Sequence, residues 1–229
     1  MAETDELPQA PAVAREVFSG DAWPRAQAFA EMLAGPGVVR GLLGPREIPR
    51  IWDRHLLNCA VVAEAVPQGA RLVDIGSGAG LPGLVLAIVR PDLQVTLLEP
   101  LLRRTIFLDE CIRDLKLANV QVLRGRAEEI AGSGEFDVAS ARAVAPLERL
   151  LSWAMPLLRV DGQLLAMKGE RAAAELAEVR DQLPRYGAAT AELVVVGRDM
   201  VDPPATLVRV VAGRPPARSA QGTRRRRKR

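Results

Sequence analysis

The stretch that decides the fold reads Val73-Asp74-Ile75-Gly76-Ser77-Gly78-Ala79-Gly80-Leu81-Pro82-Gly83. The apolar, β-branched residues before the first glycine are typical of a buried strand, predicted over residues 71–75. Glycines at alternate positions then let the backbone turn tightly and approach a ligand closely. Pro82 suits the first turn of a following helix, because its missing N–H would be unpaired there anyway. A strand, a loop of exposed amides and a helix N-terminus together predict a pocket for a nucleotide-like ligand.

An acidic residue inside this stretch narrows the choice of ligand. The letters from Gly78 to Gly83 match the dinucleotide fingerprint GxGxxG, which is weak evidence when it stands alone. Asp74 lies near the expected ligand, where a carboxylate would repel a pyrophosphate but attract the amino and sulfonium groups of S-adenosylmethionine. A second acid, Glu99, ends the next predicted strand, where either ligand class would need a carboxylate for its ribose hydroxyls. The sequence therefore favours S-adenosylmethionine and leaves a nicotinamide dehydrogenase or a ligand-free turn as alternatives.

Composition and charge exclude several classes of protein. The 229 residues carry a net charge of +3, but the six residues 224–229 are all basic, so the remainder is mildly acidic. Aromatic residues make up only 3% of the chain, which argues against base-stacking platforms. Two cysteines and one histidine are too few for a structural zinc site, and no apolar run is long enough to span a membrane. We therefore expect a cytoplasmic monomer without a metal ion or a membrane segment.

The first part of the chain is expected to form a helical cap. Residues 1–16 show no hydrophobic periodicity and are predicted to be disordered. Residues 17–69 are predicted to hold two helices, the first capped by Asp21 and ended by the helix-breaking residues 35–37. Both helices precede the first strand, so they should cover one part of the main domain.

The second cap helix is predicted to run from about Pro49 to Pro67. Its apolar face comprises Trp52, Leu56, Cys59, Ala63 and Val66. Both cysteines of the chain, Cys59 and Cys111, lie on such apolar faces and are interpreted as packing residues. His55 falls outside this face, and a lone histidine on an amphipathic helix is more often structural than functional.

From residue 70 to 213 the chain alternates between strands and helices. Alternation of this kind requires a parallel sheet with helices on both faces. The last two strands are separated only by a short loop and should therefore pair as an antiparallel hairpin. The predicted strands are 71–75, 94–98, 120–123, 136–140, 163–167, 193–196 and 206–211. The arrangement is similar to the α/β, Rossmann-like sheet of class I methyltransferases, and the basic residues 214–229 should form a disordered tail.

Cations gather where the predicted strands end. They are Arg103, Arg104, Arg126, Arg142 and Lys168. Each could be a solvated surface residue with a carboxylate partner, but five at one sheet edge favour a polyanionic substrate. The motifs of exocyclic-amine, cytosine-C5 and magnesium-dependent methyltransferases are missing from the strand ends. Guanine N7 is an acceptor that loses no proton on methylation, so alignment and desolvation could suffice without a general base.

Several motifs together resemble one family, the bacterial small-subunit rRNA guanine-N7 methyltransferases known as RsmG or GidB. Besides the glycine stretch, they are Arg54-His55-Leu56-Leu57, Arg126-Ala127-Glu128-Glu129, Ala141-Arg142-Ala143 and Lys168-Gly169. The resemblance implies methylation of guanine 527 in 16S rRNA, within the 30S subunit or an assembly intermediate, with S-adenosylmethionine as donor. The sequence departs from the family at Leu81, often Phe, at Asn58, often Asp, and in residues 38–47, which lack the usual Asn-Leu-Thr.

The resemblance also assigns site residues. It implies donor contacts at Gly76, Leu81, Ala127, Glu128 and Arg142. We expect Gly78 to join them, Asp74 to face the methionine amine, Glu99 the ribose, and the 127–128 pair the adenine. RNA contacts are expected from Arg54, His55, Arg103, Arg104, Arg126 and Lys168. A small-molecule methyltransferase and an RNA-binding protein with a vestigial donor pocket remain alternatives.

Overall fold

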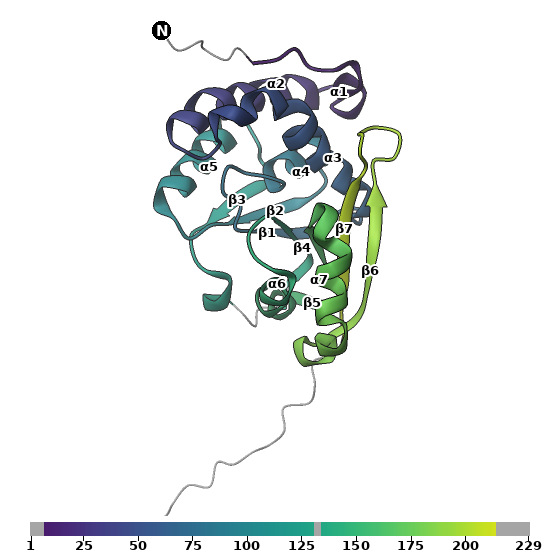
Figure 1. Cartoon of the computed structure of the whole chain (residues 1–229). Coiled ribbons are helices and arrows are strands. Elements are labelled where there is room, and N and C mark those ends of the chain that lie inside the picture. The colour runs from purple at the N-terminus through teal and green to yellow at the C-terminus, as the bar shows by residue number, and fades with distance from the viewer. Residues whose placement is uncertain (1–6, 131–133, 214–229) are drawn as a thin grey trace, which may run out of the picture.

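The computed structural model describes residues 7–130 and 134–213, which fold around one seven-stranded sheet (Figure 1). The strand order is β3-β2-β1-β4-β5-β7-β6. The first five strands run parallel, and β7 pairs antiparallel with both β5 and β6. This confirms the predicted class I sheet with its terminal hairpin. The strands are β1 (Arg71–Ile75), β2 (Gln94–Leu98), β3 (Val120–Leu123), β4 (Phe136–Arg142), β5 (Leu158–Met167), β6 (Ala188–Val196) and β7 (Ala205–Ala212).

Four strands are longer than the sequence predicted. β4 continues two residues beyond the expected end, so that Arg142 pairs in register with Met167 of β5. β5 and β6 begin well before their apolar centres, in segments that mix exposed and buried positions, whereas β7 extends by only one residue at each end. Hydrophobic runs therefore located the buried centres of the strands but missed their half-exposed ends.

Helices cover both faces of the sheet (Figure 1). One face packs against α4 (Gly83–Val89), α5 (Leu102–Asp114) and the N-terminal helices, in a single hydrophobic cluster that includes Phe29, Trp52 and Phe107. The other face packs against α6 (Leu147–Ala154) and α7 (Ala172–Val179). The cap thus shares its core with the sheet. Within the described ranges no helix is both long and apolar enough to cross a membrane.

The N-terminal segment is more ordered than expected. Residues 12–16, predicted to be disordered, belong to α1 (Ala12–Val17), whose Ala14 is fully buried. The chain before it is held by Trp52, whose Nε1 donates to the carbonyl of Pro8 at 3.1 Å. The prediction was wrong here because a short helix rich in alanine shows little hydrophobic periodicity. Residues 1–6 and the predicted tail 214–229 lie outside the described residues.

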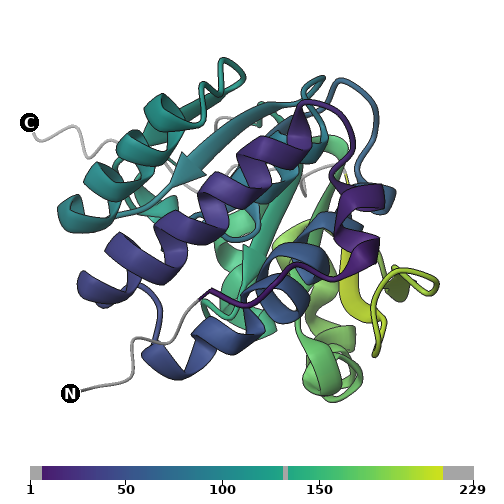
Figure 2. The same cartoon turned by 90° about the horizontal axis from the view of Figure 1, so that it is seen from above.

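The first cap helix does not break at Gly35. α2 (Ala22–Met32) continues through a π-helical turn, η1 (Leu33–Gly37), and remains helical to Val39 (Figure 2). A π-turn changes the hydrogen-bond spacing and can accommodate Pro36, which has no N–H to donate. The predicted cap by Asp21 is also wrong, because its side chain makes no capping hydrogen bond.

The second cap helix is a chain of irregular turns. It comprises η2 (Pro45–Arg50), the π-helical η3 (Ile51–Leu57), α3 (Asn58–Ala60) and η4 (Val61–Ala65). It begins four residues before the predicted start. The wider π-turn rotates later residues relative to an ideal α-helix. His55, expected outside the apolar face, is also buried, with 6% of its surface exposed, because Glu47 and Arg142 pack against it on the side away from that face.

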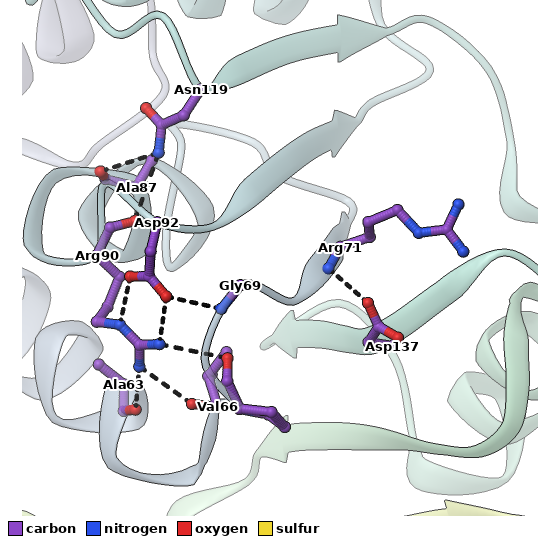
Figure 3. Close-up of polar contacts among 10 residues, drawn as sticks. Ala63, Val66, Gly69, Arg71, Ala87, Arg90, Asp92, Asn119 and Asp137 are labelled. Atoms are coloured by element: carbon purple, nitrogen blue, oxygen red, sulfur yellow. Dashed lines mark hydrogen bonds and ion pairs between the residues drawn. The ribbon is translucent and has the colours of Figure 1, made fainter.

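An arginine clamp joins the end of the cap to the sheet (Figure 3). Arg90, which follows α4, donates from Nη1 to the carbonyls of Ala63 and Val66 at 3.2 and 3.0 Å. Its Nε and Nη2 each lie 2.7 Å from a carboxylate oxygen of Asp92. Asp92 in turn accepts the backbone N–H of Gly69 at 2.8 Å, just before β1 begins. These bonds fix the cap next to the strand that carries the glycine loop.

Candidate functional site at the carboxyl ends of the strands

A cavity of about 780 Å³ opens where β1, β2 and β4 end. Parallel α/β sheets place their ligands in this position, and the volume suits a nucleoside-sized molecule. One part of its lining is the glycine loop with the segments that follow β2 and β3, and another part comes from the cap and the end of β4. Among its lining residues are Leu43, Glu47, His55, Gly76, Gly78, Glu99, Ala127, Glu128 and Arg142.

Two positions of the glycine loop have no room for a side chain. Gly76 has a φ of +68°, and a Cβ built on it would lie 2.9 Å from Cγ1 of Val144. Gly80 has a φ of +92°, and a Cβ there would lie 2.3 Å from Cδ1 of Leu84. The N–H groups of Gly76 and Ser77 both donate to the carbonyl of Leu98, at 2.8 and 3.2 Å. The loop is therefore anchored to β2 and leaves its outer surface to the cavity.

Asp74 supports this loop from below and does not face the cavity. Its side chain is fully buried, accepting the hydroxyl of Ser140 at 2.8 Å and the backbone N–H of Gly83 at 3.2 Å. Burial raises the pKa of this carboxyl to about 6, against the lowering effect of those hydrogen bonds. The expected contact of Asp74 with the ligand's amine is therefore wrong, because its carboxylate is buried beneath the loop. The side chain of a strand residue points to one face of the sheet, and here that direction leads under the start of α4.

Glu99 lies in the cavity wall, and its expected contact with the ribose stays a prediction. Its carboxylate accepts the N–H of Gly78 and the N–H of Leu101, both at 3.0 Å, and lies 3.5 Å from Nη1 of Arg104. The side chain thus joins the glycine loop to the segment after β2. A carboxylate has about four acceptor positions, so hydrogen bonds to a ligand remain possible.

The part of the lining that comes from the cap and the end of β4 contains a hydrogen-bonded chain, which we call the cap–strand network: Glu47, His55, Arg142 and Cys59. Nη2 of Arg142 lies 2.9 Å from Nδ1 of His55, and Nε2 of His55 lies 2.8 Å from Oε2 of Glu47. Nη1 of Arg142 donates to Sγ of Cys59 at 3.2 Å. Because a guanidinium only donates, Nδ1 must accept, and the imidazole proton lies on Nε2.

The network holds His55 neutral. Burial, followed by the positive charge of Arg142, lowers the pKa of His55 to about 4, although Glu47 opposes the shift. Partial burial raises the pKa of Glu47, but the bond from His55 and the charge of Arg54 outweigh it, so the net pKa is lowered. At neutral pH the network therefore contains a carboxylate, an uncharged imidazole and a guanidinium.

The predicted RNA-contacting cations fall into two groups. Arg54, Arg104 and Arg126 line the cavity together with His55, whereas Arg103 is exposed outside the lining. Their contact with RNA stays a prediction.

Lys168 is not free to bind phosphate, which corrects its expected role. Its Nζ lies 2.9 Å from Oε2 of Glu175 and also donates to the carbonyl of Ala145, and its side chain is only 7% exposed. Glu175 additionally accepts the N–H of Leu147 at 2.7 Å, at the start of α6. Burial raises the pKa of Glu175, but the bonds from Lys168 and Leu147 outweigh it and lower the net pKa. The pair fixes α6 against α7.

Several residues of the cavity or its wall were not predicted from the sequence, and four of them carry polar or aromatic side chains or a thiol. Glu47 and Cys59 belong to the network, and only the fold brings Glu47 to His55 and Cys59 to Arg142. Arg149 and Trp153 also line the cavity, with the guanidinium 4.8 Å from the indole ring. Their four-residue spacing places them on the same side of a helix that follows a strand end, so the sequence could have predicted both as neighbours near the site. In the described part of the chain, no three His, Cys, Asp or Glu side chains are grouped to hold a metal ion.

Comparisons with known proteins agree with this geometry. A family model described as rRNA small subunit methyltransferase G matches residues 23–199. The ribosomal RNA small subunit methyltransferase G of Thermobifida fusca is 61% identical over 197 residues, covering 86% of this chain and 83% of that protein. The same-named protein of a Nocardioides species is 56% identical, covering 90% and 82%.

Solved structures show the same fold at low sequence identity. TYW2 from M. jannaschii, in complex with AdoMet, is 16% identical with a TM-score of 0.54, covering 70% of this chain and 77% of that chain. The tRNA methyltransferase TrmI from Aquifex aeolicus is 16% identical with a TM-score of 0.52, covering 68% of each chain.

Proposed function

The chain belongs to the rRNA small subunit methyltransferase G family, and we propose that it methylates N7 of guanine 527 in 16S rRNA. Membership makes it an rRNA methyltransferase that uses S-adenosylmethionine. One observation carries the finer proposal. The cavity joins a glycine loop suited to the donor with a lining that contains five arginines, and both ring nitrogens of its one histidine are already hydrogen-bonded within the protein.

The glycine-loop wall fits the donor. Gly76 leaves room that a Cβ would close against Val144, and the Glu99 carboxylate is buried at the cavity edge. We assign Gly76, Gly78 and Leu81 to the methionine end of the donor, Glu99 to the ribose, and Ala127 with Glu128 to the adenine. S-adenosylmethionine supplies a methyl group on a positively charged sulfur. Asp74 acts indirectly, by holding the loop in place.

The acceptor atom needs little chemical help. Guanine N7 carries an exposed lone pair and loses no proton when it is methylated, so the protein need only align N7 with the methyl group and exclude water. His55 is no candidate for a general base, because Nδ1 already accepts from Arg142 and Nε2 already carries its proton. We assign Arg142 to the wall between donor and base.

The arginines around the cavity suit the RNA backbone. Arg54, Arg104 and Arg126 line the opening, and Arg103 is exposed nearby on α5. Cations of this kind neutralise phosphates without reading sequence, so the choice of guanine depends on the cavity itself. We propose that the protein acts in the cytoplasm as a monomer, without a metal ion, on the 30S subunit or an assembly intermediate.

The test is labelled methyl transfer to 30S particles from a strain that lacks the enzyme, followed by mapping of the modified base. The proposal predicts label at guanine 527, at a position sensitive to aniline cleavage, which reports N7 methylation. Label at another base or another atom would contradict the assignment of substrate. A Glu99→Ala variant should bind S-adenosylhomocysteine more weakly, and unchanged affinity would contradict the ribose assignment.

A further inference from the structure

We propose that Glu47 and His55 are positioning residues, which fix the guanidinium of Arg142 in the cavity wall through a one-directional chain of hydrogen bonds. The inference rests on the proposed function in one respect, that the cavity wall carrying Arg142 borders the site of methyl transfer. It assigns a role in the reaction to the cap segment 45–57, in addition to any contact with RNA.

The direction of the chain is set at both of its ends. Arg142 has hydrogens and no acceptor, so at 2.9 Å its Nη2 must donate to Nδ1 of His55. Glu47 lies at the other end, and its ionised carboxylate can only accept, so at 2.8 Å Nε2 of His55 must donate. Both neighbours therefore require the same tautomer. The imidazole cannot turn over or change tautomer without losing both bonds.

The charged groups around His55 also require it to stay neutral. Glu47 faces it from η2, Arg54 precedes it on η3, and Arg142 faces it from the end of β4. Cys59, one turn further along the cap, is buried. Its sulfur accepts a hydrogen bond from Nη1, the other terminal nitrogen of the guanidinium. If the imidazole were protonated, Nδ1 could no longer accept the hydrogen bond from Arg142, and a second cation would lie against the guanidinium. The wall thus depends on a neutral histidine.

Arg142 keeps hydrogens for a ligand while it is held in this way. A guanidinium carries five N–H groups, and the bonds to His55 and Cys59 use one on each terminal nitrogen. Three remain for the donor or the base. Displacement of a positioned group by about 1 Å can cost on the order of a hundredfold in rate, so loss of the chain should be visible in kcat.

The first part of the test uses the chain's one histidine, which gives unambiguous nitrogen signals in a tag-free, ¹⁵N-histidine-labelled full chain. We expect a neutral ring at pH 7 with the proton on Nε2. Glu47→Gln, which preserves the side-chain shape, should lower the pKa of His55 further, because the carboxylate raises it. A proton on Nδ1, a charged ring at pH 7, or a pKa unmoved in Glu47→Gln would overturn the proposal.

The second part measures methyl transfer to 30S particles, whichever base receives the label. His55→Ala should lower kcat about tenfold to a hundredfold, and His55→Asn should restore most of it, since its amide oxygen can accept from Arg142. Glu178→Ala changes an exposed residue on α7, is the matched control and should not change kcat.

A kcat equal to that of the wild type in His55→Ala would overturn the proposal. If His55→Ala fails to fold, the spectra of Glu47→Gln decide. Label mapped to an unexpected base would contradict only the proposed substrate.

Discussion

Asp74 is the side chain whose role changed most between sequence and structure. An acid beside a glycine loop suggested a ligand contact, but the fold buries it against Ser140 and Gly83. Its pKa is raised in the folded protein, so its favourable contribution to stability is fully present below the unfolded value of 3.8 and lost as pH rises through about 6.

Asp74→Asn should therefore flatten the pH dependence of stability. Asparagine stays neutral, so it does not incur the cost of a buried charge that develops above about pH 6. We expect the wild type to lose about 1–3 kcal/mol of unfolding free energy between pH 5 and pH 8 that the variant does not lose. Urea unfolding of both proteins at the two pH values measures the difference. Parallel changes in the two proteins would contradict the assignment.

Lys168 offers a prediction that separates structure from RNA binding. Removal of its ammonium in Lys168→Ala leaves Glu175 buried without its main partner, which should cost about 3–5 kcal/mol of stability. Arg126→Ala is the comparison, since Arg126 is exposed at the cavity and should affect RNA affinity without affecting stability. Thermal unfolding and RNA binding of both variants provide the test. A stable Lys168→Ala protein with weakened RNA binding would restore the role first expected from the sequence.

The sequence predicts the positions of some of these side chains but not their partners. The glycine loop, Glu99 and Arg142 follow from local rules, because a strand end and a turn fix their position. Lys168 also follows a strand, but its partner Glu175 lies on another helix, so its pairing depends on tertiary contacts. His55 was expected outside the apolar face, and its burial depends on tertiary contacts with Arg142 and Glu47 that helix periodicity does not predict.

Among the helices and strands, the Arg90 clamp makes the clearest prediction. Arg90→Ala removes bonds to the carbonyls of Ala63 and Val66, and leaves Asp92 without its cation. Hydrogen bonds to charged groups contribute about 1.5–3 kcal/mol, so a loss of at least that size is expected in urea unfolding. Arg113→Ala should change stability by less than about 0.5 kcal/mol, because its pair with Asp114 is exposed. Equal effects in the two variants would contradict the clamp.

Irregular helices account for most errors in predicting the elements. A Gly-Pro-Gly sequence normally ends a helix, yet residues 35–37 continue one through a π-turn. Strand positions were more predictable, since β-branched runs mark their buried centres even where their ends extend further. The wall of the candidate site contributed by the cap therefore lay beyond prediction, whereas the wall contributed by the sheet did not.

In the described part of the chain, the cap and the sheet share a hydrophobic core, and both contribute residues to the lining of the cavity. RNA affinity should fall steeply with salt if the arginines at the opening bind phosphates as proposed, whereas affinity for S-adenosylhomocysteine should change little. Titrations at about 50 and 200 mM salt measure both. A donor affinity that fell as steeply as RNA affinity would mean that the cations hold the donor instead.

The proposed function depends on where the donor lies. A crystal structure of the protein with S-adenosylhomocysteine should show the ribose hydroxyls at the carboxylate of Glu99, the adenine beside Ala127, and the sulfur facing the wall held by Arg142. A ligand bound elsewhere, or a cavity closed by its own side chains in the presence of saturating ligand, would contradict it.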